Sequence, residues 1–106
     1  MARTLIQAPA TARRGEVIEL RALIAHPMET GYRPGADGRV LPRDIVRRFA
    51  CRYNGEVVFA AELHAAIAAN PYLAFHAVAG ESGTLEFEWT GDQGFSQVER
   101  RTLQVT

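Results

Sequence analysis

Hydrophobic and polar residues alternate with a period of two along most of the chain. The clearest case is the segment 84–90, where Leu85, Phe87 and Trp89 are separated by Glu86 and Glu88. Because successive side chains of a strand point to opposite faces, this pattern predicts a half-buried strand. Similar patterns predict further strands over 18–24, 45–53, 57–63, 72–78 and 95–105, and a short edge strand at 5–6.

Turn signals separate these segments. Asn54-Gly55 provides the two left-handed positions of a tight hairpin turn, and Asp92-Gln-Gly94 predicts a second hairpin. About seven strands joined by such turns are typical of an all-β, immunoglobulin-like antiparallel β-sandwich. We therefore expect a single domain over residues 1–106. Its predicted core contains Leu20, Phe49, Phe59, Phe87 and Trp89.

Two segments depart from the alternation. Residues 60–69 are rich in alanine, which favours helix, and we expect about one turn of helix at 65–70, ended by Pro71. In the last strand the parity of the apolar positions changes between Val98 and Leu103, which predicts a β-bulge or a twist there.

Composition and charge narrow the classes of function. The 106 residues are 47% hydrophobic and 23% charged, as in an ordinary globular domain. Twelve basic and twelve acidic residues cancel, so nothing favours nucleic acid or an anionic membrane as a partner. The first residues lack the apolar run of a signal peptide, and the longest apolar stretch, 65–69, is too short to cross a bilayer. Taken alone, these features predict a cytoplasmic protein.

Cys51 is the one cysteine, so no internal disulfide can form. Reactive thiols lie in electropositive, partly exposed places, but strand parity puts the neighbouring Arg52 on the opposite face. Cys51 shares its face with Phe49 and Tyr53, which favours a buried structural cysteine. A thiol enzyme that uses Cys51 is the alternative.

Other candidate chemistry is sparse. His26, His64 and His76 with Met28 could supply soft ligands for a metal such as copper, but they lie in different elements and match no metal motif. Glu86 and Glu88 project from one strand face, where we expect them to be solvated. We expect no catalytic residues, no metal and no cofactor, which makes a binding module the default interpretation.

The segment 26–44 differs from the rest. It has three prolines, three glycines and no apolar alternation. Loops of this length in small domains are usually functional or mobile, so this loop is the first candidate for a binding surface. One hypothesis is an accessory β-sandwich that binds a ligand or a glycan through the 26–44 loop.

Several runs of residues carry a resemblance over essentially the whole chain. They are Arg14-Gly-Glu-Val-Ile-Glu, Ala25-His-Pro-Met-Glu-Thr-Gly-Tyr-Arg33, Pro42-Arg-Asp-Ile45, Phe49-Ala-Cys-Arg-Tyr-Asn-Gly-Glu56, Ala66-Ile-Ala-Ala-Asn-Pro71 and Glu81-Ser-Gly-Thr-Leu85. Together they resemble the SoxZ family, whose members are the Z subunits of the SoxYZ sulfur carrier complex. The His-Pro-Met-Glu-Thr-Gly and Asn-Pro elements are the most specific.

The resemblance implies a non-catalytic subunit of immunoglobulin-like fold that forms a heterodimer with SoxY. In that complex SoxY has a glycine-flanked C-terminal cysteine that carries the sulfur intermediates of thiosulfate oxidation. The loaded carrier makes transient contact with the cytochrome, hydrolase and sulfur dehydrogenase components. Residues 101–106 of this chain contain neither glycine nor cysteine, so they do not resemble that arm.

The resemblance also implies a periplasmic location, because SoxZ-like chains are exported with a signal-bearing SoxY. The isolated chain should then expose an apolar patch and associate with itself. We assign the 26–44 loop to contact with the partner's arm or a docking enzyme, its arginines binding an anionic sulfur group. The residues proposed for this contact are His26, Met28, Arg33, Arg39 and Arg43.

Overall fold

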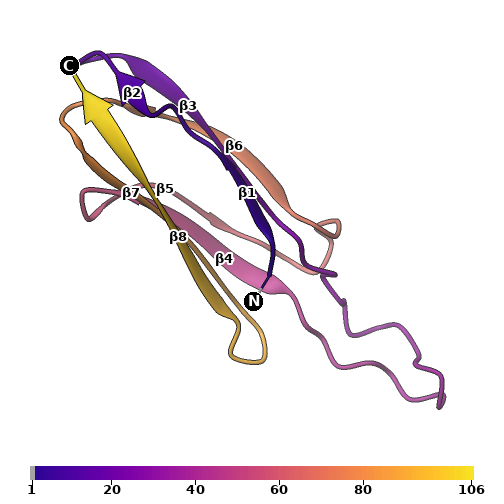
Figure 1. Ribbon diagram of the computed structural model, residues 1–106. Helices are drawn as coiled ribbons and strands as arrows, with labels where there is room; N and C mark the ends of the chain where they lie inside the picture. The colour runs from indigo at the N-terminus through magenta and orange to yellow at the C-terminus, as the bar shows by residue number, and fades with distance from the viewer. Residues whose placement is uncertain (1) are drawn as a thin grey trace.

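Strands account for most of the chain in the computed structural model, which describes residues 2–106 (Figure 1). There is no helix among these residues, and therefore none that could span a membrane. The strands are β1 (Thr4–Gln7), β2 (Thr11–Ala12), β3 (Val17–Ile24), β4 (Val46–Tyr53), β5 (Glu56–Glu62), β6 (Tyr72–Val78), β7 (Gly83–Gly91) and β8 (Ser96–Val105).

The strands form two layers. One sheet has the order β1-β3-β6 and the other has the order β2-β8-β7-β4-β5. Neighbouring strands are antiparallel, apart from the short parallel pairing of β2 with β8. The predicted antiparallel sandwich is therefore confirmed. It has eight strands rather than about seven because residues 4–12 give two short strands, one in each sheet.

The core is centred on Phe49 of β4, whose side chain is fully buried. Its ring centroid lies 5.2 Å from that of Trp89 on the neighbouring strand β7. Across the sandwich it lies 5.7 Å from the ring centroid of Phe75 on β6. Phe59 is only half-buried, because it belongs to an outermost strand. The other four predicted core residues are fully buried: Leu20, Phe49, Phe87 and Trp89.

The turn between β4 and β5 has the predicted form. Asn54 and Gly55 have φ angles of 51° and 87°, the left-handed conformation that such a turn requires. The preceding residue, Tyr53, stabilises the turn between β6 and β7. Its hydroxyl accepts hydrogen bonds from the amides of Gly80 (3.2 Å) and Glu81 (3.0 Å), and donates one to the Glu81 carbonyl.

The predicted helical turn at 65–70 is wrong. The segment makes one isolated turn, in which the Ile67 amide donates to the His64 carbonyl over 2.9 Å. It then reaches Asn70, whose φ of 55° is incompatible with helix. The backbone amide of Asn70 donates to the His26 carbonyl at 2.8 Å. This long-range contact outweighs the helix propensity of the alanines, because a helix of one turn has little stability of its own.

The predicted bulge in the last strand is also wrong. β8 pairs with β7 in unbroken register from Ser96 to Leu103. The inward position near its start is Gln97, which is buried, and not Val98. The apolar residues of β8 change parity along the sequence because a polar residue, Gln97, occupies an inward position. The Gln97 amide group binds the backbone of Ala2, over 2.9 Å to its N–H and 2.7 Å to its carbonyl.

Replacement of the largest core side chain should cost much of the stability. We expect Trp89→Ala to lower the free energy of unfolding by about 3–5 kcal/mol, as for other buried aromatic side chains. Denaturant unfolding followed by circular dichroism measures this change. Tyr32→Ala is the control, because its side chain is exposed and its loss should change stability little. Equal effects of the two substitutions would contradict the core described above.

Candidate functional site

Residues 26–44 form a protruding hairpin between β3 and β4 (Figure 1). Glu29 and Asp44 exchange two backbone hydrogen bonds of 2.8 Å near its base. Further out, the Leu41 amide donates to the Arg33 carbonyl (2.8 Å) and the Gly35 amide donates to the Arg39 carbonyl (2.6 Å). The hairpin extends the molecule to 58 Å, against 20 and 19 Å in the other two directions. It is thus an extension with its own backbone pairing.

Two of the predicted contact residues, His26 and Met28, lie buried at the base of the hairpin. His26 Nδ1 accepts a hydrogen bond from the Met28 amide (3.0 Å), and its ring meets the Phe95 ring edge-on with centroids 5.2 Å apart. Met28 has a φ of 53°, and its sulfur accepts a hydrogen bond from the Val46 amide (3.2 Å). A partner would reach these side chains only if the base opened.

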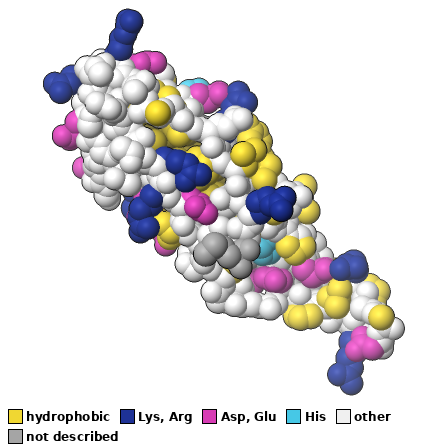
Figure 2. All heavy atoms as spheres, viewed as in Figure 1, with side chains coloured by type: hydrophobic (Ala, Val, Ile, Leu, Met, Phe, Trp, Pro, Cys, Tyr) yellow, Lys and Arg dark blue, Asp and Glu magenta, His cyan; other side chains and the backbone are white. Residues whose placement is uncertain are grey.

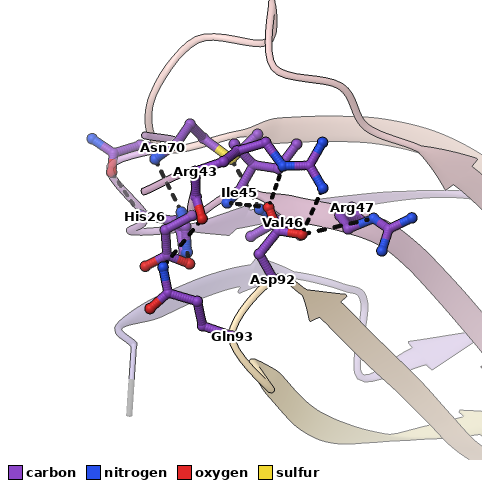
Figure 3. A network of polar contacts seen from close by, with 10 residues as sticks. His26, Arg43, Ile45, Val46, Arg47, Asn70, Asp92 and Gln93 are labelled. Atoms are coloured by element: carbon purple, nitrogen blue, oxygen red, sulfur yellow. Dashed lines mark hydrogen bonds and ion pairs between the residues drawn. The ribbon is translucent and has the colours of Figure 1, made fainter. Parts of the chain in front are cut away.

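Asp92 holds the base of the hairpin against the turn after β7 (Figure 3). Its carboxylate accepts two hydrogen bonds from Arg43, from Nε (2.7 Å) and from Nη2 (2.9 Å). It also accepts one from the Ile45 amide (3.3 Å), and Arg47 Nε lies 3.9 Å away. Gln93 adds a hydrogen bond to the Arg43 carbonyl (3.1 Å). The hydrogen bonds from Arg43 lower the pKa of the Asp92 carboxyl below its usual value.

Sequence reasoning missed this role of Asp92. The residue was identified only as the start of the Asp92-Gln-Gly94 turn, which is a correct description of its backbone. Its partner Arg43 is 49 positions away in the sequence. No local pattern links two residues so far apart, so only the fold brings them together.

The three arginines of the hairpin do not form a group of free cations. Arg33 Nη2 lies 2.6 Å from Glu29 Oε1, and this contact lowers the pKa of the Glu29 carboxyl. Arg43 is bound to Asp92 as described above. The Arg39 guanidinium has no carboxylate within 4 Å among residues 2–106, although the Arg39 backbone amide donates to Asp37 Oδ1 (3.0 Å). Charges of both signs lie along the protruding hairpin in Figure 2. The structure thus leaves Arg39 as the arginine of the three that can bind an anion without breaking an ion pair.

A hollow of about 480 Å³ lies beside the base of the hairpin. Arg47, Arg48 and His64 contribute basic groups to its wall, and Glu62 contributes a carboxylate. Arg47 and Arg48 both face solvent because a bulge interrupts the pairing of β4 with β7 at this point. The basic lining could bind a small anion, although Glu62 and Asp92 balance part of the charge.

Cys51 lies in the middle of β4 with no exposed surface. Burial raises the pKa of its thiol to about 12, and the nearby Arg52 offsets this only in part. Arg52 lies on the opposite face, as strand parity predicts. Its Nη1 contacts Glu88 at 2.9 Å and Glu86 at 3.3 Å. The two glutamates are therefore neutralised on the outer face of the sheet rather than paired in a cleft.

The histidines do not come together. His26 is buried at the hairpin base, His64 follows β5, and His76 lies on β6, where its Nε2 is 3.7 Å from Glu19. Within residues 2–106 no three His, Cys, Asp or Glu side chains lie close enough to hold a metal ion.

The burial of Cys51 predicts an unreactive thiol. A disulfide reagent at mildly alkaline pH should leave the folded chain unmodified and should label one thiol after unfolding in guanidinium, because only the thiolate reacts. Absorbance of the released thiol measures both reactions. Thr102→Cys, at an exposed position of β8, is the positive control and should react at once. Rapid labelling of native Cys51 would contradict this prediction.

The Asp92 contacts predict how firmly the hairpin is held. In Asp92→Asn the amide cannot make the paired charged contact with Arg43, so backbone amides 28–44 should exchange with solvent several-fold faster. Hydrogen exchange measures this, with Asp37→Asn at the hairpin tip as the control. Equal exchange in both variants would contradict the anchoring role.

The same contacts predict a pH dependence. Because the pKa of Asp92 is lowered in the folded state, the stabilisation of the hairpin by Asp92 should be present at neutral pH and lost as pH falls through that pKa.

Proteins of known structure share the fold of this chain. The chain is similar to superoxide reductase (neelaredoxin) from Ignicoccus hospitalis, with a TM-score of 0.75, 16% identity, and coverage of 99% of this chain and 82% of that chain. It is also similar to the sulfur carrier protein SoxY from Chlorobium limicola f thiosulfatophilum, with a TM-score of 0.65, 14% identity, and coverage of 97% and 78%. At these identities the likeness concerns the fold alone.

Sequence comparison is more specific. No curated protein matches the chain significantly. The family profile described as "Sulphur oxidation protein SoxZ", however, matches residues 6–102. The match includes β3 to β7, the protruding hairpin with its Asp92 anchor, and most of β8. The chain therefore belongs to the SoxZ family of sulphur oxidation proteins.

Proposed function

We propose that this chain is the non-catalytic Z subunit of a SoxYZ-type sulfur carrier complex. The observation that carries the proposal is the SoxZ family match over residues 6–102. In this complex the chain pairs with a SoxY-type subunit, whose C-terminal cysteine holds the sulfur intermediates of thiosulfate oxidation. The pair then meets the cytochrome, hydrolase and dehydrogenase components in turn.

The state of Cys51 supports a non-catalytic role. A sulfur carrier needs a thiolate that can reach several enzymes, and Cys51 is a buried thiol with a pKa of about 12. It is the one cysteine of the chain. The sulfur is therefore carried by the partner subunit, and this chain supplies a stable sandwich on which the partner is held.

The location follows from the same proposal. Sulfur carriers of this kind work in the periplasm, and the chain reaches it together with a SoxY-type subunit that has the export signal. Expression of the two subunits with and without the signal of the partner tests this step. Cell fractionation should place the chain in the periplasm only when the signal is present.

The decisive experiment is co-expression of the tagged chain with a SoxY-type subunit. We expect a heterodimer that supports thiosulfate oxidation when the other Sox components are added. A complex that contains Cys51→Ala should retain this turnover, because the buried thiol holds no sulfur. Absence of a complex would refute the carrier role. Loss of turnover in an intact Cys51→Ala complex would instead favour the thiol enzyme.

A further inference from the structure

The sandwich has two lateral margins, where the outermost strands of the two sheets lie side by side. At one of them, called here the closed margin, the chain passes from one sheet to the other. At this margin β1 joins the three-stranded sheet while β2 joins the five-stranded sheet, so residues 4–12 cross between the layers. Hydrogen bonds add to the closure. The Gln97 side chain of β8 binds the backbone of Ala2, and the Thr4 hydroxyl donates to Glu99 over 3.1 Å. The chain itself therefore bridges the two sheets at this margin, and the backbone N–H and carbonyl of Ala2 are satisfied there.

The opposite margin is open. It consists of β5 and β6, the outermost strands of the two sheets, and is called here the β5–β6 margin. Phe59 of β5 and Phe75 of β6 stack across it, with ring centroids 4.4 Å apart and planes inclined by 7°. No hydrogen bond joins β5 to β6 in the part of the chain that the structure describes. Each strand therefore presents an unpaired backbone edge.

Apolar side chains line this margin. The run from Val57 to Ala61 contains no charged residue and no proline, and Val57 is 54% exposed. On β6, Tyr72 and Val78 are 53% and 59% exposed. Hydrophobic side chains reach the surface over β6 in Figure 2. An uncharged, unpaired edge strand is a template for pairing with another strand, and proteins normally cover it.

Carboxylates frame the apolar centre. Glu56 and Glu62 stand at the two ends of β5, and Glu81 lies with Glu56 around a notch of about 350 Å³ whose apolar lining includes Val58 and Val78. Within residues 2–106 none of these three glutamates has a basic group within 4 Å. The margin is thus apolar in the middle and acidic at the end where Glu56 and Glu81 lie, whereas Glu62 at the other end lies among basic groups.

We infer that the β5–β6 margin binds the SoxY-type partner, through an edge strand that has an apolar centre and Lys or Arg at the end that meets Glu56 and Glu81. The inference rests on the proposed function. A strand is the occupant because it pairs with the whole row of free amides and carbonyls along β5, as in other β-strand additions. A basic end follows from Glu56 and Glu81, which form no ion pair among residues 2–106.

A second copy of this chain fits less well. An antiparallel pairing of two β5 strands about Phe59 would place Glu56 of each copy opposite Glu62 of the other. Like charges directly opposite each other destabilise a strand pair. The free carboxylates therefore favour a different chain over self-association, although both would use the same backbone edge.

Matched lysine substitutions on the two margins test the inference. Val57→Lys puts a charge in the apolar run 57–61, and lysine is a common device for blocking strand edges. Leu5→Lys is the control, since Leu5 lies on edge strand β1 of the closed margin and is 57% exposed. Titration calorimetry with the SoxY-type subunit should show Val57→Lys binding at least about tenfold more weakly. Leu5→Lys should bind within about twofold of the unchanged chain.

Two further measurements test the strand pairing and the charges. Hydrogen exchange of the complex should slow at amides within 57–61 and stay unchanged in β1. Glu56→Lys should weaken binding, because it meets the basic end of the partner strand, and added salt should reduce this difference. Protection in β1 and weak binding of Leu5→Lys would overturn the inference.

The controls separate failure of the inference from failure of the proposed function. If the unchanged chain does not bind the SoxY-type subunit, the proposed function fails. If it binds and Val57→Lys binds equally well, the function stands and the β5–β6 margin is not the interface. If sedimentation shows that the chain alone forms a dimer that Val57→Lys dissociates while the heterodimer is unaffected, the occupant is a second copy, which also overturns the inference.

Discussion

The register of β4 is the constraint on which the other features of the sandwich depend, and burial of Phe49 fixes it. Phe49 contacts Trp89 in its own sheet and Phe75 in the other. Since successive side chains of a strand face opposite sides, a slip of one residue would expose Phe49 and Cys51 and would bury Arg48 and Arg52. The protruding hairpin enters the sheet at the start of β4, so its base is positioned by the same register.

The arms of the hairpin pair with each other, but its base is held by contacts with other parts of the chain. Its base is bound to Asp92 in the turn after β7, and to Asn70 before β6 through the backbone of His26. These partners come from separate parts of the sequence, so the direction in which the extension points depends on both sheets. The ion pairs of Arg33 and Arg43 also make its surface electrically mixed, which leaves Arg39 as its free guanidinium among the described residues.

The sequence alone predicts most of the strands, but it does not predict the contacts between distant segments. Alternation around Trp89 and the Asn54-Gly55 turn predicted strands and a hairpin correctly, because both signals are local. The failures have a common cause. Gln97 occupies an inward position because it binds the first residues of the chain, and Asn70 ends the alanine-rich segment because it binds His26. The anchoring role of Asp92 was missed for the same reason.

The difference between the two margins also limits the size of any assembly. Growth of a fibre or an extended sheet requires two adhesive edges on each unit, one to bind and one to be bound. Here residues 4–12 and the Gln97 side chain close one margin. A sandwich bridged on one side exposes β5 and β6 on the same side, so strand pairing through them cannot continue across the molecule to its opposite side. The crossing of residues 4–12 between the sheets thus opposes the growth of a fibre from stacked sandwiches.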